Sequence, residues 1–129
     1  MPDRPLNKIC YVEDDEDIQR IVRLSLERIG KMTVETVSNP LEAIDRITAF
    51  TPDLVMLDWM MPGMDGPTLF KRMKQRPDMG KLPVVFITAK ASQSELDELL
   101  RLGAAGTISK PFQPKDLPDQ LRAIWAKLP

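Results

Sequence analysis

Short, mostly apolar runs alternate along the chain with segments in which apolar residues recur every three or four positions. The runs predict strands that are buried on both faces, and they lie at residues 8–12, 32–37, 53–57, 82–87 and 106–109. The periodic segments predict amphipathic helices, and they lie at residues 18–29, 40–50, 68–76, 93–102 and 117–125. Five strands alternating with five helices predict an α/β fold with right-handed crossovers, and therefore a doubly wound parallel sheet with helices on both faces.

Residues at the starts of three helical segments support these boundaries. Asn39 offers a capping side chain, and Pro40 follows it at the first helical position. Ser92 and Glu95 have the spacing of a capping box. Pro118 is compatible with the last helix because it falls in the first turn, where its missing N–H group leaves no hydrogen bond unmade.

Reactive polar residues follow four of the predicted strands. Glu13 and Asp14 follow the first strand, Asp58 the third, Thr88 the fourth and Lys110 the fifth. The ligand crevice of an open parallel sheet lies beyond the carboxyl ends of its strands, so we expect these side chains to gather at one edge. Three crowded carboxylates repel one another unless a cation enters, and Mg²⁺ prefers oxygen ligands together with phosphate. The pattern predicts a site for magnesium and phosphate.

Each of these residues also has an ordinary alternative. The acidic stretch at residues 13–17 is typical of a helix start, where the dipole favours negative charge. Asp58 is compatible with a turn at a strand end, Thr88 with a plain strand residue, and Lys110 with a surface charge. Their occurrence in order at the ends of four strands favours the functional interpretation for all of them.

Length and composition exclude several classes of protein. A chain of 129 residues is the size of a single domain, which we expect over 1–129 with a core at about 8–128. With 18 basic and 19 acidic residues, the net charge of -1 does not favour nucleic acid or an anionic membrane. No run reaches the ~20 apolar residues that a membrane helix needs, and the N-terminus lacks a signal core. We expect a cytoplasmic monomer.

The cysteine and histidine counts narrow the chemistry further. Cys10 is the chain's only cysteine and lies in an apolar run, so we expect it to fill the core. The sequence contains no histidine, which excludes Ser-His and Cys-His catalysis, histidine metal sites and a phosphohistidine on this chain.

The ordered set of strand-end residues resembles the receiver domain of two-component response regulators. The resemblance covers about residues 8–128 and includes Glu13-Asp14, Asp58, Thr88 and the pair Lys110-Pro111. It implies a flavodoxin-like sheet with strand order 2-1-3-4-5.

The resemblance also implies a role for each site residue. Asp58 is the phosphoacceptor, and Asp14 and Asp58 are direct Mg²⁺ ligands. Glu13 acts on the metal mainly through water, and the backbone carbonyl of Met60 completes the protein ligands. Lys110 supplies a cation and the Thr88 hydroxyl supplies a donor to the phosphoryl group. We further expect a cis peptide bond at Lys110-Pro111 that aims Lys110 at the site.

By the same resemblance, the chain is a regulatory phosphoacceptor rather than a metabolic enzyme. Asp58 accepts a phosphoryl group from a sensor histidine kinase or a histidine phosphotransfer protein, and the change switches binding to a downstream protein. Self-phosphorylation from small donors and self-dephosphorylation remain open. Two alternatives remain: a phosphorelay intermediate that passes the group on, and a Mg²⁺-dependent hydrolase with an aspartyl nucleophile. The hydrolase is disfavoured because no second acid follows Asp58 closely.

Several positions near the site carry additional hypotheses. Trp59 either packs against the fold or covers the mouth of the site. Met60 is bulky enough to hinder water and slow the loss of the phosphoryl group. Thr107 stands where many receivers carry an aromatic residue, which puts aromatic coupling to Thr88 in doubt. We expect activation to move Thr88 and the loop at Ala89 and Lys90, and with it the face of the fourth helix, fifth strand and last helix.

Overall fold

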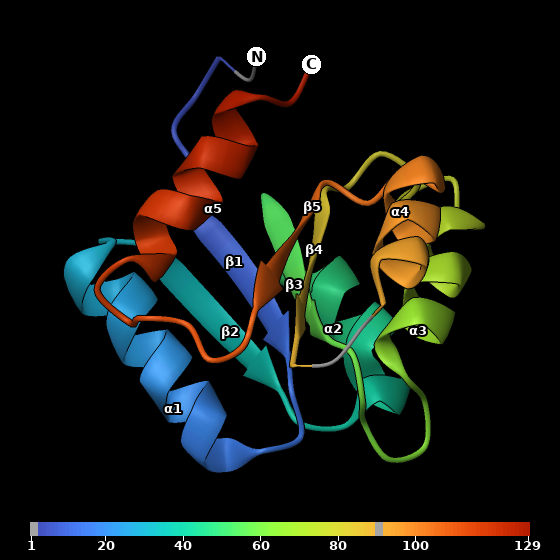
Figure 1. Ribbon diagram of the computed structural model, residues 1–129, viewed down its shortest axis with the longest axis horizontal. Helices are drawn as coiled ribbons and strands as arrows, with labels where there is room; N and C mark the ends of the chain where they lie inside the picture. Colours follow the sequence, from blue (N-terminus) through green and yellow to red (C-terminus); the bar gives the residue numbers. More distant parts are fainter. Residues whose placement is uncertain (1–2, 90–91) are drawn as a thin grey trace.

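The computed structural model describes residues 3–89 and 92–129, and these residues form a five-stranded sheet with helices on both faces (Figure 1). The strands are β1 (Lys8–Val12), β2 (Thr33–Val37), β3 (Leu54–Asp58), β4 (Val84–Thr88) and β5 (Gly106–Ser109). Neighbouring strands are all parallel, in the order β2-β1-β3-β4-β5. The predicted α/β fold and strand order are therefore confirmed.

The helices follow the strands in the predicted alternation. They are α1 (Glu16–Leu24), α2 (Ala43–Phe50), α3 (Gly66–Lys74), α4 (Gln93–Arg101) and α5 (Leu117–Ala126). A π-helical turn (Ser25–Ile29) continues α1, and a 3₁₀ turn (Pro40–Glu42) leads into α2. The first two predicted helices therefore exist over their full predicted lengths, but each changes its helical type along the way.

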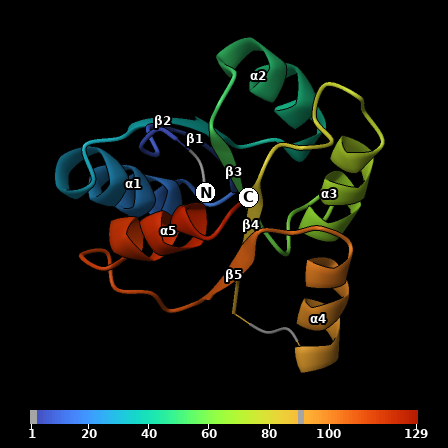
Figure 2. The same ribbon diagram turned by 90° about the horizontal axis from the view of Figure 1, so that it is seen from above.

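The helices form two layers around the sheet. Seen from above, α1 and α5 cover one face, while α2, α3 and α4 cover the other (Figure 2). Alternate residues of each strand enter the two cores: Ile9 and Tyr11 of β1 face the α1/α5 layer, and Cys10 and Val12 face the opposite layer. Cys10 is fully buried, as predicted, and burial followed by the charge of Glu35 raises the pKa of its thiol to about 12.

The predicted starts of three helices are confirmed in their local contacts. The Asn39 side chain accepts a hydrogen bond from the backbone N–H of Leu41. Ser92 and Glu95 form a reciprocal capping box at α4. Pro118 lies in the first turn of α5, where a missing N–H group costs little.

Several predicted boundaries are wrong by one or two residues, and those of β3, β4 and α3 have clear physical reasons. β3 begins at Leu54 rather than Asp53. The Asp53 carboxylate instead accepts hydrogen bonds from the backbone of the N-terminal segment. β4 begins at Val84, after Pro83, which has no N–H group to donate to the sheet. α3 begins at Gly66, because Asp65 caps the helix by accepting from the backbone N–H of Thr68.

A close backbone approach fixes the loop that follows β3. The Gly66 N–H donates to the carbonyl of Trp59 at 2.9 Å. A Cβ atom on Gly66 would lie 2.3 Å from the carbonyl oxygen of Asp58, so no other residue fits there without a shift of backbone. The start of α3 is thereby held against the end of the central strand, next to the predicted site.

Candidate functional site

The strand-end residues singled out in the sequence line one hollow at the carboxyl-terminal edge of the sheet. The hollow has a volume of about 350 Å³. It is lined by Glu13, Asp14, Asp15, Ile18, Asp58, Trp59, Met60, Thr88, Ala89 and Lys110. All six predicted site residues are in this set, although they come from four separate strand ends. The sheet topology alone accounts for this convergence, because the strands are parallel.

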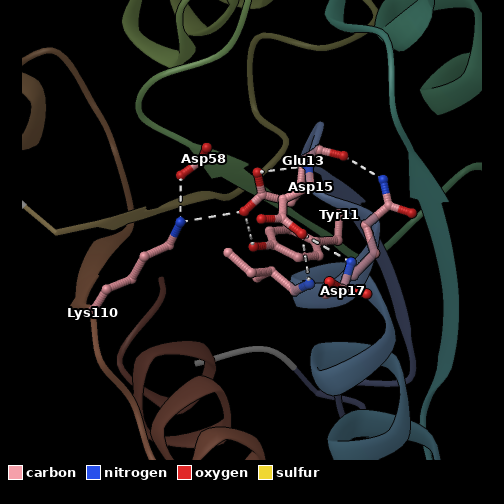
Figure 3. A network of polar contacts seen from close by, with 8 residues as sticks. Tyr11, Glu13, Asp15, Asp17, Asp58 and Lys110 are labelled. Carbon is pink, nitrogen blue, oxygen red and sulfur yellow. Dashed lines mark hydrogen bonds and ion pairs between the residues drawn. The ribbon is translucent and has the colours of Figure 1, made fainter.

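Lys110 is the cation at the centre of the hollow. Its Nζ atom lies 2.8 Å from Oδ1 of Asp58 and 3.2 Å from Oε1 of Glu13 (Figure 3). Burial disfavours the ammonium charge, but hydrogen bonds and attraction to Asp58 and Glu13 outweigh it and raise the pKa of Lys110. The backbone N–H of Lys110 donates to the carbonyl of Thr88 at 2.8 Å. The Lys110-Pro111 peptide bond is cis, as predicted.

Glu13 is the most deeply buried carboxylate of the site, with 1% of its surface exposed. Besides Lys110, its Oε1 atom faces the hydroxyl of Tyr11 at 3.0 Å, and its Oε2 atom accepts from the backbone N–H of Asp15 at 3.4 Å. Burial and then the neighbouring Asp58 raise the pKa of Glu13, and Lys110 and Tyr11 only partly oppose this rise. The charged form of Glu13 therefore depends on cations and donors around it.

Glu13, Asp14 and Asp58 form a cluster of oxygen donors. One carboxylate oxygen from each lies within 4.8 Å of the others, with Asp14 exposed and the other two buried. An all-oxygen set that is open on one side fits Mg²⁺, which keeps several water ligands and binds few protein groups. Met60 lies at the rim of the hollow with 74% of its surface exposed. The metal contact of its backbone carbonyl stays a prediction.

Thr88 ends β4 and is 7% exposed within the hollow. In the ladder it pairs with Ser109, two residues after Thr107, which pairs with Phe86. The predicted movement of the loop after Thr88 involves Ala89, which lines the hollow, and Lys90, which lies outside the described residues.

Trp59 combines the two placements considered from the sequence. Its ring packs edge to face on Phe86, with ring centroids 5.7 Å apart. It also lines the hollow, and it lines a neighbouring cleft that includes Lys71 and Leu99. The residue is therefore a packing group that also borders the site.

Two residues that support the site were missed in the sequence. Tyr11 contacts Glu13, and only the alternation of β1, which puts residues 11 and 13 on the same face, could have suggested it. Gln19 is 9% exposed, and its amide donates to the carbonyl of Glu13 and, at 3.0 Å, to Ser38 Oγ. A polar residue on the buried side of a helix was the available signal.

Together, the doubly wound sheet and its acidic, lysine-containing edge define a phosphoacceptor type of regulatory domain. The family model of the response regulator receiver domain matches residues 9–122, and the chain belongs to this family. Phosphorylation of an aspartate and binding of Mg²⁺ at an acidic pocket are general properties of the family.

Individual relatives agree with this assignment. The chain is 38% identical over 119 residues to the phosphate regulon transcriptional regulatory protein PhoB of Rhizobium meliloti, covering 92% of this chain and 52% of that protein. It is 33% identical over 121 residues to PhoB of Escherichia coli, covering 94% of this chain and 52% of that protein. The chain therefore spans about half the length of these relatives.

Solved structures have the same fold. The Vibrio cholerae chemotaxis protein CheY4 superposes with a TM-score of 0.84 at 26% identity, covering 92% of this chain and 98% of that one. The receiver domain of a Francisella response regulator gives a TM-score of 0.82 at 25% identity, covering 96% of this chain and 98% of that one. Within residues 3–89 and 92–129, none of the helices has the length and apolar character needed to cross a membrane.

Proposed function

We propose that this chain is a signalling phosphoacceptor in which Asp58 takes a phosphoryl group from a phosphohistidine of a sensor kinase or phosphotransfer protein. One observation carries the proposal: Lys110 Nζ lies 2.8 Å from Asp58 Oδ1, inside a hollow that is also lined by the carboxylates of Glu13, Asp14 and Asp15. Phosphoryl transfer depends mainly on positioning and on neutralisation of charge, and this arrangement supports both.

Asp58 is the best placed nucleophile of the three carboxylates. It ends the central strand β3, and its Oδ1 atom pairs with the Lys110 ammonium group. Glu13 is held by Tyr11, Lys110 and a backbone N–H group, whereas Asp14 is exposed beside them. In the proposed step a carboxylate oxygen of Asp58 bonds to phosphorus, the bond from phosphorus to the donor's imidazole nitrogen breaks, and that nitrogen keeps the electron pair.

The carboxylates of Glu13, Asp14 and Asp58 and the Met60 carbonyl are the groups that would hold Mg²⁺. When bound, the metal offsets the negative charge of the carboxylates and of the incoming phosphoryl oxygens. Lys110 then contacts a phosphoryl oxygen, and the Thr88 hydroxyl donates to another.

The proposed output is a change in affinity for a downstream protein. Thr88 ends β4 and is followed by the loop that leads to α4, so its movement toward a phosphoryl oxygen would alter the surface of α4, β5 and α5. Thr107 in β5 is not aromatic, so we propose that the switch operates without an aromatic rotation at this position.

Intact-mass measurement with a small acyl-phosphate donor tests the chemistry. We expect the original chain to gain one phosphoryl group only when Mg²⁺ is present, and Asp58→Asn to gain none. Asp15→Asn is the matched control, because Asp15 also lines the hollow but serves as the N-cap of α1. Uptake by Asp58→Asn equal to that of the original chain would overturn the assignment.

Two further arms separate the alternatives. Transfer of the group from the phosphorylated chain to a histidine phosphotransfer protein would identify a relay intermediate. Catalytic turnover of a phosphate ester that depends on Asp58 would identify a hydrolase instead.

A further inference from the structure

Tyr11 is a buried polar residue that the roles above leave unused. It is 0% exposed, and its ring packs in the core beneath α1 and α5. Glu13 continues the ladder of β1, since its N–H donates to the carbonyl of Val37 at 2.9 Å. Residues 11 and 13 therefore point to the same face, and the Tyr11 hydroxyl lies 3.0 Å from Glu13 Oε1, below the site (Figure 3).

The direction of this hydrogen bond follows from the chemistry of the two groups. A phenol hydroxyl carries a proton, whereas an ionised carboxylate only accepts, so the Tyr11 hydroxyl donates to Glu13. A buried hydroxyl needs such an acceptor, because leaving it without a partner costs free energy.

The oxygen that receives the Tyr11 hydrogen bond is also the one that contacts Lys110. Glu13 Oε1 lies 3.2 Å from Lys110 Nζ, and the same Nζ lies 2.8 Å from Asp58 Oδ1. On the other side, Glu13 Oε2 faces the backbone N–H of Asp15 at 3.4 Å. A continuous chain of contacts therefore runs from Tyr11 through one carboxylate oxygen to Lys110 and on to Asp58.

We propose that Tyr11 is a positioning residue for phosphoryl uptake. Its hydroxyl fixes the Glu13 carboxylate and, through the oxygen that Glu13 shares with Lys110, the placement of the ammonium group beside Asp58. The inference rests on the proposed function of Asp58. Without the hydroxyl, the Glu13 carboxylate keeps only Lys110 and the backbone N–H of Asp15 as partners, so it is held less firmly and the alignment of the metal ligands with the ammonium group loosens. Reactions that depend on positioning respond strongly to such displacements.

Tyr11→Phe tests the proposal, because it removes one oxygen atom and leaves the ring in the core. We expect Mg²⁺ to bind about 3- to 10-fold more weakly, and phosphoryl uptake at saturating metal and donor to be about 3- to 10-fold slower. Trp59 lines the hollow, so its fluorescence serves to follow Mg²⁺ binding. Intact mass follows uptake from the acyl-phosphate donor.

Two comparisons separate positioning from a merely structural role. Ile9→Val is the matched control, because Ile9 is 0% exposed on the same face of β1 and the change removes only a methylene group. We expect Ile9→Val to lower stability and leave Mg²⁺ affinity and uptake within about 1.5-fold of the original. In a Glu13→Gln background, we expect Tyr11→Phe to change both quantities by less than about 1.5-fold, because the residue through which it acts is already altered.

The outcomes distinguish the inference from the function on which it rests. The inference is overturned if Tyr11→Phe matches the original chain in both measurements, if Ile9→Val has effects as large, or if Glu13→Gln leaves the effect of Tyr11→Phe undiminished. The proposed function fails separately, when the original chain itself gains no phosphoryl group, and the inference falls with it.

Discussion

Two buried aspartates flank the central strand, and their surroundings differ in a way that separates structure from function. Asp53 lies just before β3 and is 8% exposed, whereas Asp58 ends β3 and is 6% exposed. Each contacts a cation, which is Arg4 for Asp53 and Lys110 for Asp58. Burial and ion pairing are therefore common to both edges of the sheet.

Donors are in excess around Asp53. Its Oδ2 atom accepts from the backbone N–H groups of Asn7 at 3.0 Å and Lys8 at 2.8 Å, and its Oδ1 atom pairs with Arg4. Burial alone would raise the pKa of Asp53, but these hydrogen bonds outweigh it and hold the pKa below its ordinary value. The side chain of Trp125 binds the carbonyl of Arg4 at 2.9 Å, which ties α5 to the same segment. Asp53 anchors the N-terminal segment.

Carboxylates are in excess around Asp58. Among the described residues, the Lys110 ammonium group serves both Asp58 and Glu13, and Asp14 adds a third carboxylate within 4.8 Å. Such a site gains from an added cation, whereas the edge around Asp53 does not. The balance of donors and carboxylates, rather than burial, therefore distinguishes the edge that we propose to be functional.

The largest expected difference between the edges is in phosphoryl uptake. Asp58→Asn removes the proposed nucleophile, so we expect uptake to fall by a factor on the order of 100 or more. Asp53→Asn lies at the opposite edge, and we expect its rate of uptake to match that of the original chain. Time-resolved intact mass of the two variants under the same donor and metal concentrations measures both rates. Equal losses of phosphoryl uptake in the two variants would show that the two edges of the sheet do not differ in this function.

Stability should change in the opposite order. Asp53→Asn weakens hydrogen bonds to a buried charged acceptor, and we expect the free energy of unfolding to fall by about 1.5–3 kcal/mol. Asp58→Asn removes one of three crowded charges, and we expect no loss of stability. Urea unfolding in the absence of Mg²⁺ measures both variants. A larger loss in Asp58→Asn would mean that the site is a structural ion pair.

Magnesium should stabilise the fold through the carboxyl-terminal edge alone. At a free Mg²⁺ concentration 100 times its Kd, we expect the free energy of unfolding to rise by about 2.7 kcal/mol. The rise should vanish in Asp14→Asn and persist in Asp53→Asn, because the three clustered carboxylates do not include Asp53. Thermal unfolding with Mg²⁺ and with a chelator measures this effect. Loss of the rise in Asp53→Asn would contradict the comparison.

Low pH should lower the free energy of unfolding through protonation of Asp53. The pKa of Asp53 is lower in the folded chain than in the unfolded one. Its contribution to stability is therefore complete above about pH 4, the ordinary value for the unfolded chain, and is lost as the pH falls through the folded value. We expect the unfolding free energy of the original chain to decline below about pH 4 more steeply than that of Asp53→Asn. Identical slopes in a urea series from pH 5 to pH 2.5 would contradict this account.

The smallest expected effect concerns the rim of the functional hollow. Met60 is 74% exposed beside Asp58, so Met60→Asn replaces a bulky apolar side chain with a smaller polar one that can orient water. We expect the half-life of the acyl phosphate to shorten by about 2- to 5-fold, which is at most about 1 kcal/mol in the barrier. Met64→Leu is the control, because Met64 lies in the same loop at 9% exposure. An unchanged half-life of the acyl phosphate in Met60→Asn would show that Met60 does not slow its hydrolysis.

The sequence was sufficient for the architecture and for the convergence of the strand-end residues on one hollow. Apolar runs and helical spacing predicted the order of elements, and the rule for parallel sheets brought Glu13, Asp58 and Lys110 to one edge. These predictions succeed because periodicity and strand direction are local properties of the chain.

Contacts between residues that lie far apart along the chain could not be predicted from the sequence. Asp53 was predicted as the first residue of a strand, but its carboxylate accepts N–H groups from Asn7 and Lys8, about 45 residues away along the chain. Alternation fixes the face of Tyr11 but not its partner, and the donor role of Gln19 depends on how α1 packs beside Glu13. Such partners are determined by tertiary packing, which the periodicity of the sequence does not specify.

The site of the phosphoryl group tests the central claim most directly. Borohydride reduction converts an aspartyl phosphate to homoserine, and peptide mapping by tandem mass spectrometry then locates the modified residue. We expect homoserine at position 58 after treatment with an acyl-phosphate donor and Mg²⁺, with Asp14 and Asp53 unchanged. Homoserine at position 14 or 53, with an intact Asp58, would contradict it.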